Sequence, residues 1–274
     1  MNAQASPVVK KMVFRHTNRH MGRCLSVTPA NSTNKHLSYG RIILNRDAPS
    51  VSFNNGNQET GLTCLSGAAV VKVGDSTFTC NQYDSVYIPR DSRIDVSTTT
   101  SVDIAEFCSD VDNHYPLQFV SHAELSKDPS LSFNAGTPGQ ARRVNICIGK
   151  NVQAGRLLVG FTMSEPGNWT SWPPHEHAKM LEEMYVYINM PAPGFGLQMV
   201  YNNMDYPEMV VPVREGDAVL MPSGYHPNVA IPGHPISFLW AMAAHREKED
   251  RQFGVVNVQP GFNQGGSGLE ASRK

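Results

Sequence analysis

The chain has 274 residues and a formal net charge of −1, and charged residues make up only 17% of it. Lys and Arg occur in no basic run longer than a pair, so nothing indicates a nucleic-acid partner. No apolar stretch approaches the ~18 residues of a transmembrane helix. Residues 1–11 lack the apolar core of a secretion signal. The five cysteines have no CxxC spacing. We therefore expect no membrane association, a cytoplasmic location and free thiols.

Residues 1–40 are mixed and polar, and we assign them to an N-terminal segment. From residue 41 onward, strand-like runs recur with turn signals between them, which is typical of a β-sandwich or a small barrel. We assign residues 41–120 to a first barrel. Its expected strands are residues 41–44, 59–73 with a turn at Ser66-Gly67, 77–80, 84–89 and 101–108.

A region rich in Asp, Ser, Asn and Pro follows. We place a connector at residues 121–141, with one helical turn at residues 123–125. A second barrel occupies residues 142–257, with expected strands at 156–162, 183–190, 195–201, 209–213, 217–221, 226–230 and 236–244. The Gly/Ser-rich tail, residues 258–274, is expected to be flexible.

A short internal repeat relates the two halves. Residues 83–89 and 216–222 each read as a turn with an aspartate, an apolar strand and a proline. Two copies of one β unit explain this pattern. The sequence therefore predicts an all-β protein made of two tandem small barrels with few short helices.

Potential metal ligands gather in the second half. In the string Pro173-Pro174-His175-Glu176-His177, the two histidines are two residues apart, so on a strand both imidazoles point to the same side. Glu183 opens the next strand, and His226 follows a later one. Imidazole and carboxylate ligands suit zinc or manganese, which we favour, and also iron or nickel. The first half has Arg93 at the offset of His226 and lacks a His-x-His, so we expect one metal ion, in the second half.

Two adjacent glutamates compete for the carboxylate position. If Glu183 faces the interior, alternation sends Tyr185 and Tyr187 inward and turns Glu182 away. We favour Glu183, with Glu182 as the alternative.

Other polar residues are candidates for substrate binding. Arg156 heads an apolar strand, where its guanidinium could hold a carboxylate or form a solvated strand end. Arg143 is a second candidate, although an ion pair or a solvated position is the favoured interpretation of both Arg142 and Arg143. Gln198 could offer its amide to a sugar hydroxyl.

The metal motif resembles the cupin superfamily, whose small barrels carry His-x-His, a Glu and a distant His. A closer resemblance covers about residues 140–254. The strings Pro166-Gly167-Asn168-Trp169, Pro173-Pro174-His175-Glu176-His177 and Gly224-Tyr225-His226-Pro227 are similar to those of the 5-deoxy-glucuronate isomerases of myo-inositol catabolism. The same family includes the 4-deoxy-L-threo-5-hexosulose-uronate ketol-isomerases of pectin breakdown. The resemblance implies a bicupin with metal ligands at His175, His177, Glu183 and His226.

The resemblance also implies an enzyme: a metal-dependent aldose–ketose isomerase that converts 5-deoxy-D-glucuronate, a small sugar acid, to 5-dehydro-2-deoxy-D-gluconate. Glu176, Lys179, Tyr187 and Tyr201 are candidates for moving the proton, and a hydride shift is the other route. The pectin-pathway ketol-isomerase, or a cupin dioxygenase or epimerase, would use the same ligands. A sugar-binding regulator is disfavoured because we find no helix-turn-helix segment. A homo-oligomer is left open.

Overall fold

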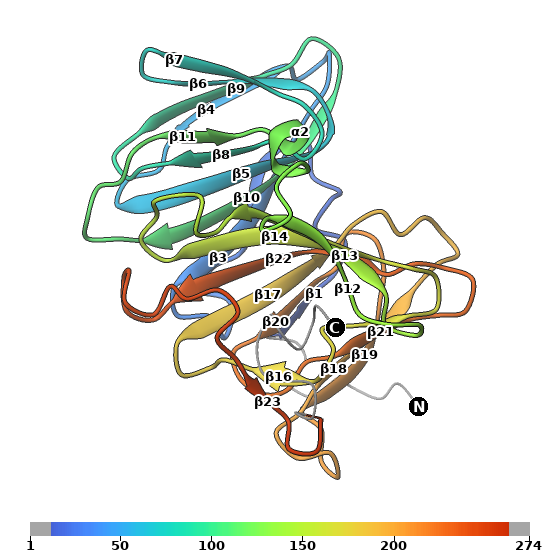
Figure 1. Ribbon diagram of the computed structural model, residues 1–274. Helices are drawn as coiled ribbons and strands as arrows, with labels where there is room; N and C mark the ends of the chain where they lie inside the picture. Colours follow the sequence, from blue (N-terminus) through green and yellow to red (C-terminus); the bar gives the residue numbers. More distant parts are fainter. Residues whose placement is uncertain (1–11, 263–274) are drawn as a thin grey trace.

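The computed structural model describes residues 12–262 of the chain. Its regular structure is almost entirely β, arranged in two halves that follow each other along the chain (Figure 1). The predicted all-β class and tandem arrangement are thus confirmed. In this part of the chain, no helix is long and apolar enough to cross a membrane. All five cysteines are free, as predicted.

The first half is built from a six-stranded sheet, in the order β11-β8-β5-β10-β3-β2, and a four-stranded sheet, in the order β4-β9-β6-β7. Apolar residues from both sheets form one buried cluster, which includes Ile42, Leu62, Val71 and Ile94. The strands are β2 (Gly22–Val27), β3 (Leu37–Leu44), β4 (Ser50–Asn54), β5 (Gln58–Gly67), β6 (Ala69–Val73), β7 (Ser76–Cys80), β8 (Ser85–Ile88), β9 (Arg93–Ser97), β10 (Val102–Asp110) and β11 (Gln118–Val120).

The second half repeats this plan with a seven-stranded sheet, β1-β20-β17-β22-β14-β13-β12, a four-stranded sheet, β15-β21-β18-β19, and the short pair β16-β23. Its elements are β1 (Val13–Phe14), α2 (His122–Leu125), β12 (Ser132–Ala135), β13 (Arg142–Ile148), β14 (Leu157–Ser164), β15 (Trp169–Thr170), β16 (His175–Glu176), β17 (Leu181–Tyr187), β18 (Gly196–Val200), β19 (Met209–Val213), β20 (Ala218–Met221), β21 (Asn228–Ala230), β22 (Ser237–Ala244) and β23 (Asn257–Val258).

Some elements fall outside the ranges assigned from the sequence. β1 and β2 lie within residues 1–40; β2 joins the first half, whereas β1 pairs with β20 of the second. β12 lies within the expected connector and pairs with β13. At the end of the chain, β23 pairs with β16. Of the tail expected to be flexible, residues 263–274 lie outside the described residues.

The internal repeat corresponds to equivalent places in the two halves. β8 pairs with β5 as β20 pairs with β17. Before each strand the aspartate closes the same turn: Asp84 Oδ2 accepts a hydrogen bond from Asn81 N at 2.9 Å, and Asp217 Oδ2 accepts one from Arg214 N at 3.0 Å. Both strands therefore begin from one kind of side-chain-capped turn.

The two large sheets lie against each other between the halves (Figure 1). Two buried glutamates, one from each half, accept hydrogen bonds from the backbone of the other half. Glu59 on β5 accepts hydrogen bonds from three backbone N–H groups at the start of β14, at 2.6–2.7 Å: Gly155, Arg156 and Leu157. Glu182 on β17 accepts three from the start of β3, at 2.6–2.8 Å: Lys35, His36 and Leu37.

The strand registers show that these glutamates are counterparts. Thr60 lies opposite Ile88, and Glu183 lies opposite Met221, at the matching ends of β8 and β20. Glu59 is therefore equivalent to Glu182, and Thr60 is equivalent to Glu183. At the position that faces the interior of each half, the first half has Thr60 and the second has Glu183. At the position that faces the other half, both have a glutamate.

Candidate metal centre

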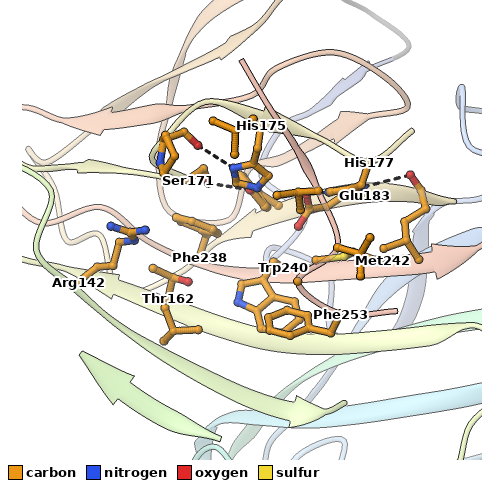
Figure 2. A pocket seen from close by; sticks show the side chains of 18 of the residues that line it. Arg142, Thr162, Ser171, His175, His177, Glu183, Phe238, Trp240, Met242 and Phe253 are labelled. Carbon is orange, nitrogen blue, oxygen red and sulfur yellow. Dashed lines mark hydrogen bonds and ion pairs between the residues drawn. The ribbon is translucent and has the colours of Figure 1, made fainter. Parts of the chain in front are cut away.

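A cavity lies against one face of the seven-stranded sheet in the second half. Strand alternation places every second residue of neighbouring strands on this face, among them Arg142, Thr162, Phe238, Trp240 and Tyr185. The segment around β16 and residues 253–258 complete the lining. Figure 2 shows Arg142 at one side of the cavity, Glu183 at the other and the aromatic rings between them. The cavity thus combines apolar walls with a few polar groups, as small-molecule sites do.

Three histidines meet at one end of this cavity. His175 lies on β16, His177 follows that strand, and His226 precedes β21. One ring nitrogen of each histidine lies within 4.8 Å of the other two. Oε2 of Glu183 lies 3.0 Å from Nε2 of both His177 and His226. The structure therefore brings together the four residues that the sequence singled out as ligands.

The second nitrogen of each ring fixes its orientation. Nδ1 of His175, His177 and His226 contacts a main-chain carbonyl oxygen, of Pro173 (2.8 Å), Leu181 (3.2 Å) and Gly224 (2.8 Å) respectively. A carbonyl oxygen only accepts hydrogen bonds, so each Nδ1 carries the proton. In the neutral ring Nε2 is then left as a lone-pair donor atom, and this is how metal-binding histidines are held.

The convergence of these atoms fits a cation. Nε2 of His226 is buried and makes no hydrogen bond among the described residues, although the Glu183 carboxylate is 3.0 Å away. Nε2 of His177 shares a proton with the Glu183 carboxylate at 3.0 Å, and a bound cation would take the place of that proton and also satisfy Nε2 of His226. Three imidazoles and one carboxylate also match the donor set that divalent transition metals prefer.

Burial and neighbouring charges shift the titration of these groups. Burial, followed by the neighbouring imidazoles of His226 and His177, lowers the pKa of His175 to about 3, so this ring is neutral at physiological pH. Burial alone would raise the pKa of Glu183, but the hydrogen bond from His177 and the nearby imidazoles hold it well below its usual range. Both groups are therefore in the form that binds a metal.

Glu182 and Glu183 point in opposite directions. Glu183 faces the histidines, and Glu182 faces the first half of the chain, where it accepts the three backbone hydrogen bonds described above. Tyr185 lies on the same side of β17 as Glu183, and its hydroxyl is 2.7 Å from Ser171 Oγ.

The residues predicted to bind substrate lie elsewhere. Arg156 donates to the carbonyl oxygens of Asp110, Ala244 and His245, and so joins the two halves outside the cavity. Arg143 is exposed and donates to Ser132 Oγ at 2.8 Å. Gln198 is buried behind the histidines, where its Nε2 donates to the carbonyl oxygen of His226 at 3.0 Å and supports that loop.

None of the four residues predicted to move a proton lines the cavity. Glu176 accepts hydrogen bonds from Ala178 N and Asn257 Nδ2. Lys179 is exposed. The hydroxyls of Tyr187 and Tyr201 donate to Gln198 and Gln259, each at 2.6 Å.

Sequence reasoning missed Arg142 and Ser171. Residues 142–148 had not been assigned as a strand, and without that assignment nothing separates the inward Arg142 from the outward Arg143. With it, alternation places Arg142 on the same face as Val144. Ser171 carried no signal, because its position depends on the loop before β16.

Comparison with known proteins shows relatives for nearly the whole chain. A model of the KduI/IolB family matches residues 11–256. The 5-deoxy-glucuronate isomerase of Geobacillus kaustophilus is 32% identical over 166 residues, which are 58% of this chain and 58% of that protein. The chain thus matches less than two thirds of the length of that relative.

Solved structures share the fold. An IolB-like protein from Salmonella typhimurium superposes with a TM-score of 0.80 at 23% identity, covering 92% of this chain and 97% of the other. The oxalate decarboxylase of Bacillus subtilis, with Mn(II) centers, gives a TM-score of 0.64 at 13% identity, covering 91% and 80%. At these identities the likeness shows the fold, two tandem cupin domains in one chain.

Proposed function

This chain belongs to the KduI/IolB family, and on that premise we propose that it is a metal-dependent aldose–ketose isomerase. The favoured reaction converts 5-deoxy-D-glucuronate to 5-dehydro-2-deoxy-D-gluconate in myo-inositol catabolism, as the sequence resemblance implies; the name of the Geobacillus relative, 5-deoxy-glucuronate isomerase, supports the substrate. The observation that carries this proposal is the convergence of three imidazoles and Glu183 in one cavity. We place the reaction in the cytoplasm, where free thiols remain reduced.

His175, His177, His226 and Glu183 would hold one divalent ion. We favour zinc or manganese, and iron or nickel would accept the same donors. When bound, the ion would act as a Lewis acid toward the substrate oxygens at C1 and C2.

The isomerisation moves a hydrogen from C2 to C1 and a proton from the C2 hydroxyl to the C1 oxygen. Tyr185 and Ser171 present a pair of hydroxyls to the cavity, 2.7 Å apart. Burial, followed by the charge of Glu183, raises the pKa of Tyr185 well above its usual value, so the phenol keeps its proton. We assign to this pair the transfer of the proton between the two oxygens.

The transfer between carbons is proposed to be a hydride shift. Among the described residues that line the cavity, the ionisable groups are the proposed ligands, Arg142 and Tyr185. Arg142 is a cation and Tyr185 keeps its proton, so neither is a base. Apolar walls such as Phe238 and Trp240 exclude water from the migrating hydrogen.

The test is an NMR assay in D₂O that offers 5-deoxy-glucuronate and the pectin-derived ketouronate side by side, with metal analysis of the same sample. We expect turnover of 5-deoxy-glucuronate and no solvent deuterium on the CH2OH carbon of the product, which was the aldehyde carbon of the substrate. His177→Ala and His226→Ala should lose the metal and lower activity by more than about 100-fold, because even disturbing the support of a ligand costs 10–100-fold.

The exposed His114→Ala serves as the control and should leave metal and activity unchanged. Turnover by metal-free protein would contradict the proposal. Preference for the ketouronate would move the assignment to the ketol-isomerase, and oxygen consumption would move it to a cupin oxygenase. Deuterium on the CH2OH carbon of the product would restore a base and overturn the hydride route alone.

A further inference from the structure

Arg142 is a buried cation on the cavity wall. It is the only Lys or Arg among the described residues that line the cavity. It is 7% exposed, and no described carboxylate lies within ion-pair distance of it. Burial is the main influence on its pKa and lowers it to about 10, so the guanidinium still carries its charge at neutral pH. A buried charge without a counter-ion is costly, which points to a ligand that supplies one.

The guanidinium is held in place with donors to spare. One terminal nitrogen donates to the carbonyl oxygen of Gln140 at 2.8 Å, and the other donates to that of Trp172 at 2.6 Å. Arginine has five N–H donors, and these are the two hydrogen bonds that the side chain makes to described residues. Two neutral carbonyls fix the plane of the group without neutralising it.

Its position relative to the histidines suits a chain of a few carbons. Tyr185 lines the same cavity as Arg142, and its ring centroid is 5.9 Å from that of His226. Figure 2 shows the guanidinium across the cavity from Glu183. A ligand whose two ends are a carbonyl and an anion could contact both places at once.

Apolar and hydroxyl side chains both lie near Arg142, and Thr162 on β14 is opposite Val144. Val144 is on the same face of β13, and Phe133 is paired with Val144 across β12. A phosphate would need more donors and more positive charge than one guanidinium, whereas the planar fork of arginine matches a carboxylate.

We propose that Arg142 anchors the substrate carboxylate. This inference rests on the proposed isomerase function. It adds a specificity-determining residue that holds the acid end while the aldehyde end lies at the histidines.

The experiment separates binding from turnover. The first probe is the alditol acid made by reducing the aldehyde of 5-deoxy-glucuronate, which has no carbonyl and cannot be isomerised. The second is its neutral twin, with a primary alcohol in place of the carboxylate. Both are titrated calorimetrically into the metal-loaded full chain. We expect the wild-type protein to bind the acid about 10–100-fold more tightly than the alcohol, the range of a charge-assisted hydrogen-bond pair.

Arg142→Met should remove this preference by weakening the acid alone. Arg142→Lys, which keeps the charge but loses the fork, should fall between. Arg143→Met is the matched control, one residue along the same strand with its side chain exposed, and should change neither affinity. Metal content and melting temperature confirm that each variant is folded.

Each outcome bears on one proposal at a time. Equal binding of acid and alcohol by the wild-type protein, or an equal loss of both in Arg142→Met, overturns the anchor even if the protein isomerises the uronate. A preference that depends on Arg142, in a protein that turns over neither substrate, keeps the anchor and refutes the isomerase. With active protein, Arg142→Met should raise KM for the uronate far more than it lowers kcat.

Discussion

At the scale of single residues, the molecule uses two neighbouring glutamates for different purposes. Glu183 faces three imidazoles, and Glu182 faces three backbone N–H groups of the other half. Their separation follows from the two-residue period of a strand. One carboxylate therefore belongs to the proposed metal centre and the other to the packing of the two halves.

Replacing each glutamate separately with glutamine tests these two roles. Glu182→Gln should lower the free energy of unfolding by about 2–4 kcal/mol, because buried N–H groups lose charged acceptors and one faces an amide donor instead. It should leave metal binding intact. Glu183→Gln should abolish tight metal binding while leaving the backbone hydrogen bonds that Glu182 accepts from the other half unchanged. Urea unfolding and metal analysis of both variants measure this, and equal loss of metal from both would contradict the division.

The residues that gather at the candidate centre could be predicted from the sequence better than the rest of the cavity. Histidines two residues apart, a glutamate at a strand start and a histidine after a proline are local patterns, and alternation alone favoured Glu183 over Glu182. The substrate end was assigned to Arg156, although Arg142 lines the cavity. Which of two arginines faces inward depends on strand β13, and the position of Arg156 depends on contacts with residues about 90 positions away.

At the scale of elements, long strands with clear alternation, such as β5, β14 and β22, could be predicted from the sequence. Short ones could not: β15, β16 and β23 have two residues each, and a two-residue strand exists only because a distant partner pairs with it. β16 is the most consequential of these, since it carries His175 and pairs with the end of the chain.

The packing of β14 against β22 supports the cavity wall. A Cβ at Gly160 would lie 2.1 Å from the ring of Trp240 and 2.2 Å from the carbonyl oxygen of Asn145. Gly160→Ala should therefore cost about 1–3 kcal/mol of stability, as overpacking does, and should raise KM by displacing Trp240. Adding Trp240→Leu should restore part of the stability in a thermal melt. An unshifted melting temperature in the single variant would contradict this account.

At the scale of the whole molecule, a third carboxylate connects the halves near the surface. Glu247, after β22, accepts hydrogen bonds from the backbone of Asp112 and Asn113, and from Tyr115 at 2.5 Å. Burial alone would raise the pKa of Glu247, but these hydrogen bonds lower it below its ordinary value of 4.5. Its ionised form is therefore favoured by folding.

The sign of the pH dependence follows. A carboxyl group whose pKa is lower in the folded state stabilises the protein above its unfolded pKa and loses this effect as the pH falls through its folded pKa. Stability should decline from about pH 4.5 downward, and Glu247→Gln should remove about 1 kcal/mol of the neutral-pH stability, a modest value because the group is partly solvated. Urea titrations between pH 3 and 7 measure both. An unchanged slope in Glu247→Gln below pH 4.5 would assign the acid sensitivity to other groups.

The reciprocal glutamates also indicate that the two halves of the chain have different roles. In each half, one buried glutamate accepts backbone hydrogen bonds from the other half. Reciprocal contacts of this kind also occur where two identical copies pair around a two-fold axis. When the two halves belong to one chain, this glutamate contact is the feature that both halves need. The first barrel keeps its glutamate at position 59 while carrying Thr60 where its twin has Glu183. The first half therefore packs against the half that carries the candidate metal centre and holds it in place.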